Sequence, residues 1–71
     1  MSKEVKFLIF CIEEYKNAKK LTGQQAMAVF NKYNVIDYII DCYEALHTTG
    51  IKFIVDDIDE YVETRQVVVK T

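Results

Sequence analysis

Apolar residues recur along the chain at helical spacing and divide it into four segments. The longest apolar run covers residues 7–12 and is flanked by charged residues. At about 100° per residue, Leu8, Cys11 and Ile12 fall on one face of a helix, whereas Phe10 falls among polar residues on the other. The spacing predicts a first helix over residues 3–20. Phe10 would then be covered either by another segment, such as the C-terminal tail, or by a partner or a second copy of the chain.

Two further helices are predicted in the middle of the chain. Thr22 and Gln25 have the spacing of a capping box, which starts a second helix over residues 23–33. Asn34 interrupts the pattern, either as a left-handed stop or as the cap of the next helix. A third helix is predicted over residues 35–48, and Gly50 follows it as the C′ residue that ends it.

The last segment allows two interpretations. Residues 51–55 are rich in β-branched side chains and fit either an extended connector or a short strand. Asp56 or Asp57 would cap a short fourth helix that ends near Arg65. Three valines at 67–69 would either pair with residues 51–55 or fray. The predicted fold class is mainly α: a compact bundle of four helices, the fourth short, with a minor two-stranded β pairing left open.

Composition agrees with one small helical domain over residues 1–71. The chain has no proline and only two glycines, whereas the many turns of a β domain usually contain proline and glycine. Its apolar runs are too short for a membrane span or a signal peptide. Cys11 and Cys42 both fall in apolar surroundings, so we expect free thiols rather than a disulfide, in a cytoplasmic protein.

The net charge of −2 hides a strong asymmetry along the chain. Residues 37–63 contain eight acidic residues and one lysine, whereas residues 1–36 contain six lysines and three glutamates. On the third predicted helix, Asp37, Asp41 and Glu44 form an outward stripe with Tyr38 at its border. This stripe is either a solvated helix face or a docking surface for a basic protein partner. The candidate partner-binding residues are Phe10, Asp37, Tyr38, Asp41 and Glu44.

Other classes of function find little support in the residues. The short turn before the third helix suggests a helix-turn-helix DNA-binding regulator, but a recognition helix without a basic residue would repel phosphates. Cys42 and His47 do not share a helix face, which argues against a metal site. His47 is the only histidine that could activate a cysteine, and no glycine-rich phosphate loop exists. We therefore expect no catalytic residue, no metal and no cofactor.

A family resemblance is carried by residues 33–50, YNVIDYIIDCYEALHTTG, and by residues 54–61, IVDDIDEY. Together with residues 7–15, these stretches resemble a family of short bacterial proteins of unknown function. The resemblance implies a small, mainly helical protein with no established activity. Some members are encoded beside an ADP-ribosyltransferase-like protein, which implies an antitoxin-like or immunity-like role. It supplies no catalytic residues.

Overall fold

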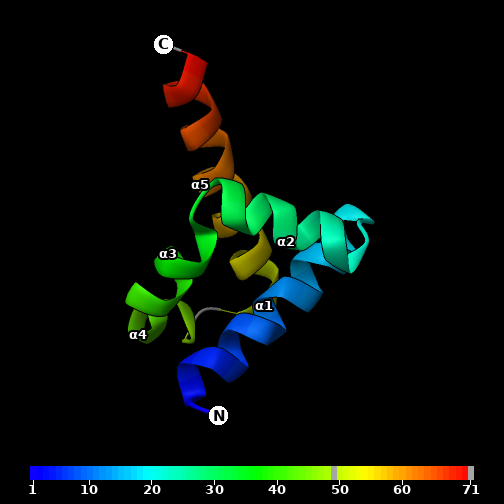
Figure 1. The fold of residues 1–71 in the computed structure, drawn as a ribbon. Coiled ribbons are helices and arrows are strands. Elements are labelled where there is room, and N and C mark those ends of the chain that lie inside the picture. The colour runs from blue at the N-terminus through cyan, green and yellow to red at the C-terminus, as the bar shows by residue number, and fades with distance from the viewer. Residues whose placement is uncertain (49, 71) are drawn as a thin grey trace.

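The computed structural model contains five helices in the part of the chain that it describes, residues 1–48 and 50–70. Side chains are described for all of these residues except 51, 52 and 67–70. The helices are α1 (Lys3–Lys19), α2 (Gly23–Lys32), α3 (Val35–Asp41), α4 (Tyr43–Leu46) and α5 (Ile51–Lys70). Figure 1 shows the two chain termini at opposite ends of the molecule, with the C-terminal part of α5 extending beyond the other helices.

Local signals fix the starts of the first three helices. The Ser2 hydroxyl accepts the Val5 N–H at the start of α1. Thr22 and Gln25 form the predicted capping box at the start of α2. Asn34 has φ 57° and ψ 36° and makes no side-chain capping bond, which confirms the left-handed stop of the two predicted alternatives. Asparagine is one of the few residues that adopts this conformation at low cost.

The core is built from residues four apart on each long helix. Such residues lie on one face of a helix, so each helix contributes a stripe to a common cluster. The fully or almost fully buried residues are Cys11 and Tyr15 of α1, Ala26 and Phe30 of α2, Val35 and Ile39 of α3, Leu46 of α4, and Ile54, Ile58 and Val62 of α5. Helix α1 contacts α2, α3 and α5, so the apolar run at 7–12 lies at the centre of the fold.

The β pairing that the sequence left open is not supported. Residues 51–55 and 67–69 both lie in α5, which is the longest helix rather than a short one, and no strand occurs in the described part of the chain. Asp56 and Asp57 therefore lie inside a helix and cap nothing. The physical reason is burial: Ile54, Ile58 and Val62 continue a four-residue stripe into the core, and this packing outweighs local β propensity.

The third predicted helix is interrupted, which the sequence did not indicate. It breaks at Cys42, whose φ of −103° and ψ of 19° separate α3 from α4. After the break Leu46 enters the core and the Tyr43 ring meets Phe7 edge-on, with 5.4 Å between ring centroids. Gly50 does not have the left-handed conformation typical of a C′ residue, because no glycine of the described chain has positive φ. Its carbonyl instead accepts the N–H groups of Phe53 and Ile54 in the first turn of α5.

Phe10 lies at the margin of the core. It is half-buried, packs against the core cluster and stacks on Phe7 at 6.3 Å between ring centroids. The helical spacing predicted that Phe10 would lie among polar residues, on the face opposite the core. Because α1 contacts three other helices, a larger part of its surface is buried, and Phe10 falls partly within that surface. Its remaining exposed surface keeps Phe10 a candidate contact for a partner.

Candidate interaction surface

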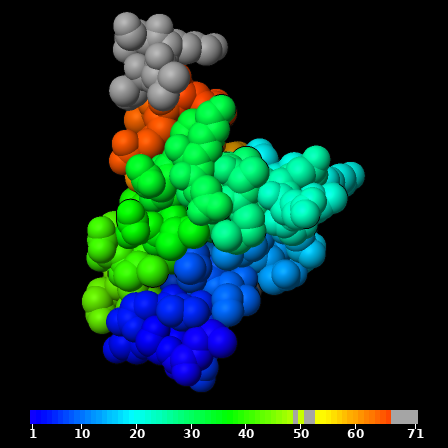
Figure 2. Space-filling view, in the orientation of Figure 1, coloured from blue at the N-terminus to red at the C-terminus, as the bar shows by residue number. Residues whose placement is uncertain are grey.

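The outer side of α3 and the adjoining α4 carry an acidic face, which we define as Asp37, Ile40, Asp41 and Glu44. All four side chains are exposed, and Ile40 retains 38% of its surface. Asp37, Ile40 and Asp41 lie three and four residues apart, so they are neighbours on one side of α3. Figure 2 shows α3 and α4 at the molecular surface beside the N-terminal part of α1. Asp37 and Asp41 are thus neighbours of the exposed Ile40 on α3, and Glu44 follows on α4, beyond the break at Cys42.

The three carboxylates of the acidic face have no partner within the described residues. Neither a hydrogen bond nor a salt bridge involves the side chain of Asp37, Asp41 or Glu44 among these residues. Each is exposed, so water solvates the charge and no energetic penalty arises. These groups therefore contribute nothing specific to the fold and stay available for a partner.

Two carboxylates of α5 are used differently. Asp57 accepts a hydrogen bond from the Tyr38 hydroxyl at 3.0 Å between oxygens. Asp59 forms a salt bridge with Lys19 at 2.9 Å, which ties the end of α1 to α5. The acidic segment predicted from the sequence therefore contains the acidic face, two carboxylates in internal contacts, and three further exposed acids on α5, which are Asp56, Glu60 and Glu63.

Tyr38 belongs to the contact between α3 and α5 rather than to the acidic face. Its ring stacks on Tyr61 with 4.0 Å between centroids and 14° between ring planes, and Arg65 lies over the Tyr61 ring at 4.5 Å. Partial burial, followed by the bond to Asp57, raises the pKa of Tyr38 to about 12. Both the ring and the hydroxyl of Tyr38, a candidate partner-binding residue, thus already make contacts within the fold.

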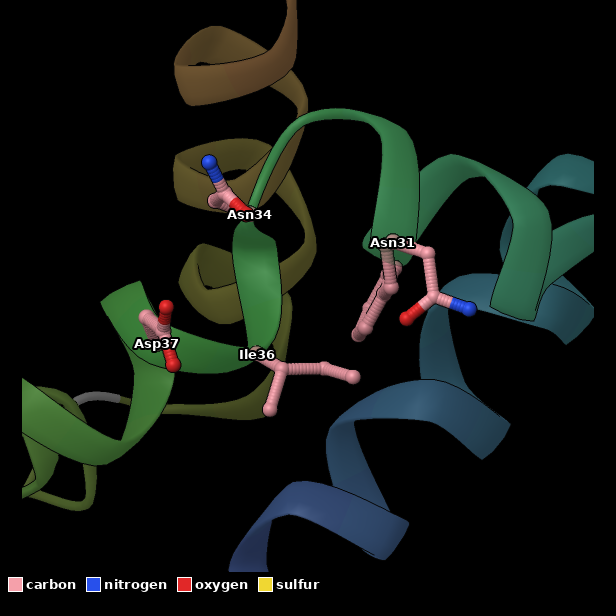
Figure 3. Close-up of a pocket in the computed structure, with 5 residues that line it drawn as sticks. Asn31, Asn34, Ile36 and Asp37 are labelled. Carbon is pink, nitrogen blue, oxygen red and sulfur yellow. The ribbon is translucent and has the colours of Figure 1, made fainter.

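A pocket lies beside the acidic face, where α2 meets α3. This α2–α3 pocket has a volume of about 190 Å³ and is lined by Phe30, Asn31, Asn34, Ile36 and Asp37. In Figure 3, Ile36 points from α3 toward α2 and Asn31 lies on the α2 side, while the polar groups of Asn34 and Asp37 lie along α3. Phe30, a fully buried residue of α2, is also among the lining residues. Asp37 belongs to both the pocket and the acidic face.

The three residues considered for catalysis, Cys11, Cys42 and His47, lie in different environments. Cys11 is fully buried and free, and burial together with nearby Glu14 raises the pKa of its thiol to about 12, so it stays protonated. Cys42 is also free and half-buried. The His47 ring stacks on Tyr43, and its Nδ1 lies 2.7 Å from the Tyr43 carbonyl oxygen. This geometry describes a histidine engaged in local packing.

No group of three or more His, Cys, Asp or Glu side chains among the described residues is placed to hold a metal ion. None of the helices in that part of the chain is long and apolar enough to cross a membrane.

Comparison with protein families gives one match. The model of the family "Protein of unknown function (DUF3791)" matches residues 6–65, which is most of the chain. The chain belongs to the DUF3791 family. The match confirms the resemblance to an uncharacterised family, and the small, mainly helical fold agrees with it. Comparisons with curated proteins and with solved structures gave no match.

Sequence reasoning missed the exposed Ile40 in the acidic face and the α2–α3 pocket. Ile40 is one of several apolar residues in its segment, and only the orientation of α3 shows that it is 38% exposed. Asn31 and Asn34 are separated by a turn whose geometry is set by the left-handed Asn34. The one signal in the sequence was Asn34, which predicts a turn between the two helices that line the pocket.

Proposed function

We propose that this protein is a small non-enzymatic interaction module that docks a basic protein partner through its acidic face. One observation carries the proposal: Asp37, Asp41 and Glu44 are all exposed and unpaired within the described residues, and they adjoin the exposed Ile40. An exposed apolar residue with charges beside it is a common arrangement at protein interfaces. The charges would steer association and fix orientation, while Ile40 would lose its water on binding.

An antitoxin-like or immunity-like pairing is the specific form of this proposal. Its support is the family resemblance, which implies genes located beside an ADP-ribosyltransferase-like protein. A partner with a basic surface would complement the acidic face electrostatically. Co-expression with the product of the adjacent gene, followed by co-purification, tests this form of the proposal directly.

The docking proposal is tested with matched charge variants. The test variant replaces the acidic face (Asp37→Asn, Asp41→Asn, Glu44→Gln), and the control replaces three exposed acids of α5 (Asp56→Asn, Glu60→Gln, Glu63→Gln). Both variants remove the same charge from exposed positions. The probe is a synthetic peptide of alternating glycine and lysine, measured by calorimetry at low salt.

We expect the test variant to bind the peptide about tenfold more weakly, since three exposed ion pairs together contribute roughly 1.5 kcal/mol. The control should lose less than half of that free energy. Equal losses in the two variants would mean that binding follows overall charge, and unchanged binding in the test variant would contradict docking at the acidic face.

A DNA-binding regulator is the second candidate, favoured by the short α2–α3 connection alone. Only Tyr33 and Asn34 separate the two helices, as in helix-turn-helix proteins. Helix α3, in the position of a recognition helix, exposes Asp37 and Asp41 and has no lysine or arginine. A gel-shift assay at low salt tests it; retardation of any DNA would favour this candidate over protein docking.

A further inference from the structure

The α2–α3 pocket combines three polar side chains with two apolar ones, of which Ile36 is partly exposed. Asn31, Asn34 and Asp37 line it together with Ile36 and Phe30. None of the three polar side chains makes a hydrogen bond or salt bridge within the described residues, so their oxygens are open to a ligand. A pocket with both acceptors and apolar side chains suits a ligand with a polar head and an apolar stem.

The size of the pocket limits its ligand. Pockets for drug-sized molecules and cofactors have volumes of roughly 300–1,000 Å³. The α2–α3 pocket measures about 190 Å³, which is below this range and is enough for one amino-acid side chain. Because the pocket adjoins the acidic face through Asp37, a side chain from a partner docked there can reach it.

The charge of the pocket selects a cation. Asp37 is the only charged residue among those that line it. The nearest basic residue in the sequence, Lys32, has its ammonium group over the Tyr33 ring, 5.4 Å from the centroid. The backbone N–H groups in the first turn of α3 carry a partial positive charge, which weakens the negative potential of the pocket. The Asp37 carboxylate is therefore the group that would attract a cation.

We propose that the α2–α3 pocket receives one arginine side chain of the basic partner. The guanidinium would meet the Asp37 carboxylate and the Asn34 amide oxygen, and its methylene stem would lie on Ile36. Arginine fits better than lysine, because its planar fork has five donors for several acceptors and its weaker hydration lowers the cost of entry. This inference rests on the proposed docking function and adds a single specific anchor to it.

The test uses the full chain labelled with nitrogen-15 and three blocked pentapeptides. They share the sequence Gly-Ser-X-Ser-Gly, where X is arginine, lysine or citrulline. Citrulline has nearly the shape of arginine without its charge, so it separates recognition of the cation from recognition of the stem. Shifts of backbone amide signals locate the binding site at low salt.

With the arginine peptide we expect saturable shifts at Asn31, Asn34, Ile36 and Asp37. The lysine peptide should bind several-fold more weakly, and the citrulline peptide should give no saturable shift. Asp37→Asn should weaken arginine binding by about twofold to fivefold, whereas the matched variant Asp56→Asn, outside both the pocket and the acidic face, should leave it nearly unchanged. Both positions are exposed, so neither variant should affect folding.

Two results would overturn the pocket proposal. Equal binding of the citrulline peptide would show that the pocket does not recognise charge. Arginine-induced shifts confined to Asp41, Glu44 or the acids of α5 would show that the cation binds elsewhere. If the glycine–lysine peptide still requires the acidic face in that case, docking stands and only the pocket proposal fails; if both peptides bind without preference, both proposals fail.

Discussion

Two sets of carboxylates in the acidic half of the chain have opposite relations to the fold. Asp57 and Asp59 of α5 bond to Tyr38 of α3 and Lys19 of α1, so they join helices. Asp37, Asp41 and Glu44 have no such partner among the described residues and are exposed to solvent. Residues of one type, close in sequence, thus divide into a structural set and a free set. The difference teaches that an acidic segment is not one functional unit.

The apolar residues beside each set should show the largest contrast. Ile58 of α5 is fully buried, so Ile58→Ala should lower the free energy of unfolding by about 2–5 kcal/mol through lost burial and a cavity. Ile40, within the acidic face, is 38% exposed, and Ile40→Ala should cost less than about 1 kcal/mol. Urea unfolding followed by circular dichroism measures both. Similar losses would place Ile40 in the core.

The Tyr38–Asp57 hydrogen bond should have an intermediate effect. Tyr38→Phe keeps the ring stacked on Tyr61 but removes the donor, and it should lower stability by about 1 kcal/mol. The comparison variant Asp41→Asn should change stability by less than about 0.5 kcal/mol. A loss for Asp41→Asn as large as that for Tyr38→Phe would mean that the acidic face is also structural.

The same contact gives stability a dependence on alkaline pH. The pKa of Tyr38 is raised to about 12 in the fold from an ordinary value of 10.0, so the folded chain holds this proton more tightly than the unfolded chain. This contribution is complete below pH 10 and is lost as the pH rises toward about 12. Cys11 acts in the same direction, starting from pH 9.0. In unfolding curves measured across this range, Tyr38→Phe should lose less stability than the native chain.

The salt bridge between Lys19 and Asp59 should contribute less. Its side chains are 40% and 35% exposed, so water and salt screen the pair. Asp59→Asn should cost roughly 0.5 kcal/mol at low salt, and the cost should shrink at high salt. Thermal unfolding at two ionic strengths measures this difference. A cost that does not depend on salt would indicate that Asp59 acts through packing.

Neutralising the acidic face should have the smallest effect on stability. The triple variant Asp37→Asn, Asp41→Asn and Glu44→Gln removes three unpaired exposed charges, so the free energy of unfolding should stay within about 0.5 kcal/mol of native. The same variant should lose peptide binding, which separates folding from docking. A large loss of stability would contradict the division into two sets of carboxylates.

The sequence by itself determined the first half of the fold. Ser2, the Thr22–Gln25 capping box and Asn34 act through bonds and dihedral angles within a few residues, so they define α1, α2 and the start of α3 without tertiary contacts. It also determined the family and the acidic character of residues 37–63.

The tertiary structure decided the rest. Residues 51–55 favour a strand locally but become helical because Ile54 and Ile58 meet the core, and α3 breaks at Cys42 without a glycine or proline there. It also decided which carboxylates stay free: the packing of α3 against α5 puts Tyr38 on Asp57 and leaves Asp37 and Asp41 outside. Local bonds fix helix starts, but burial and pairing depend on residues far apart in the chain, which spacing along the sequence does not bring together.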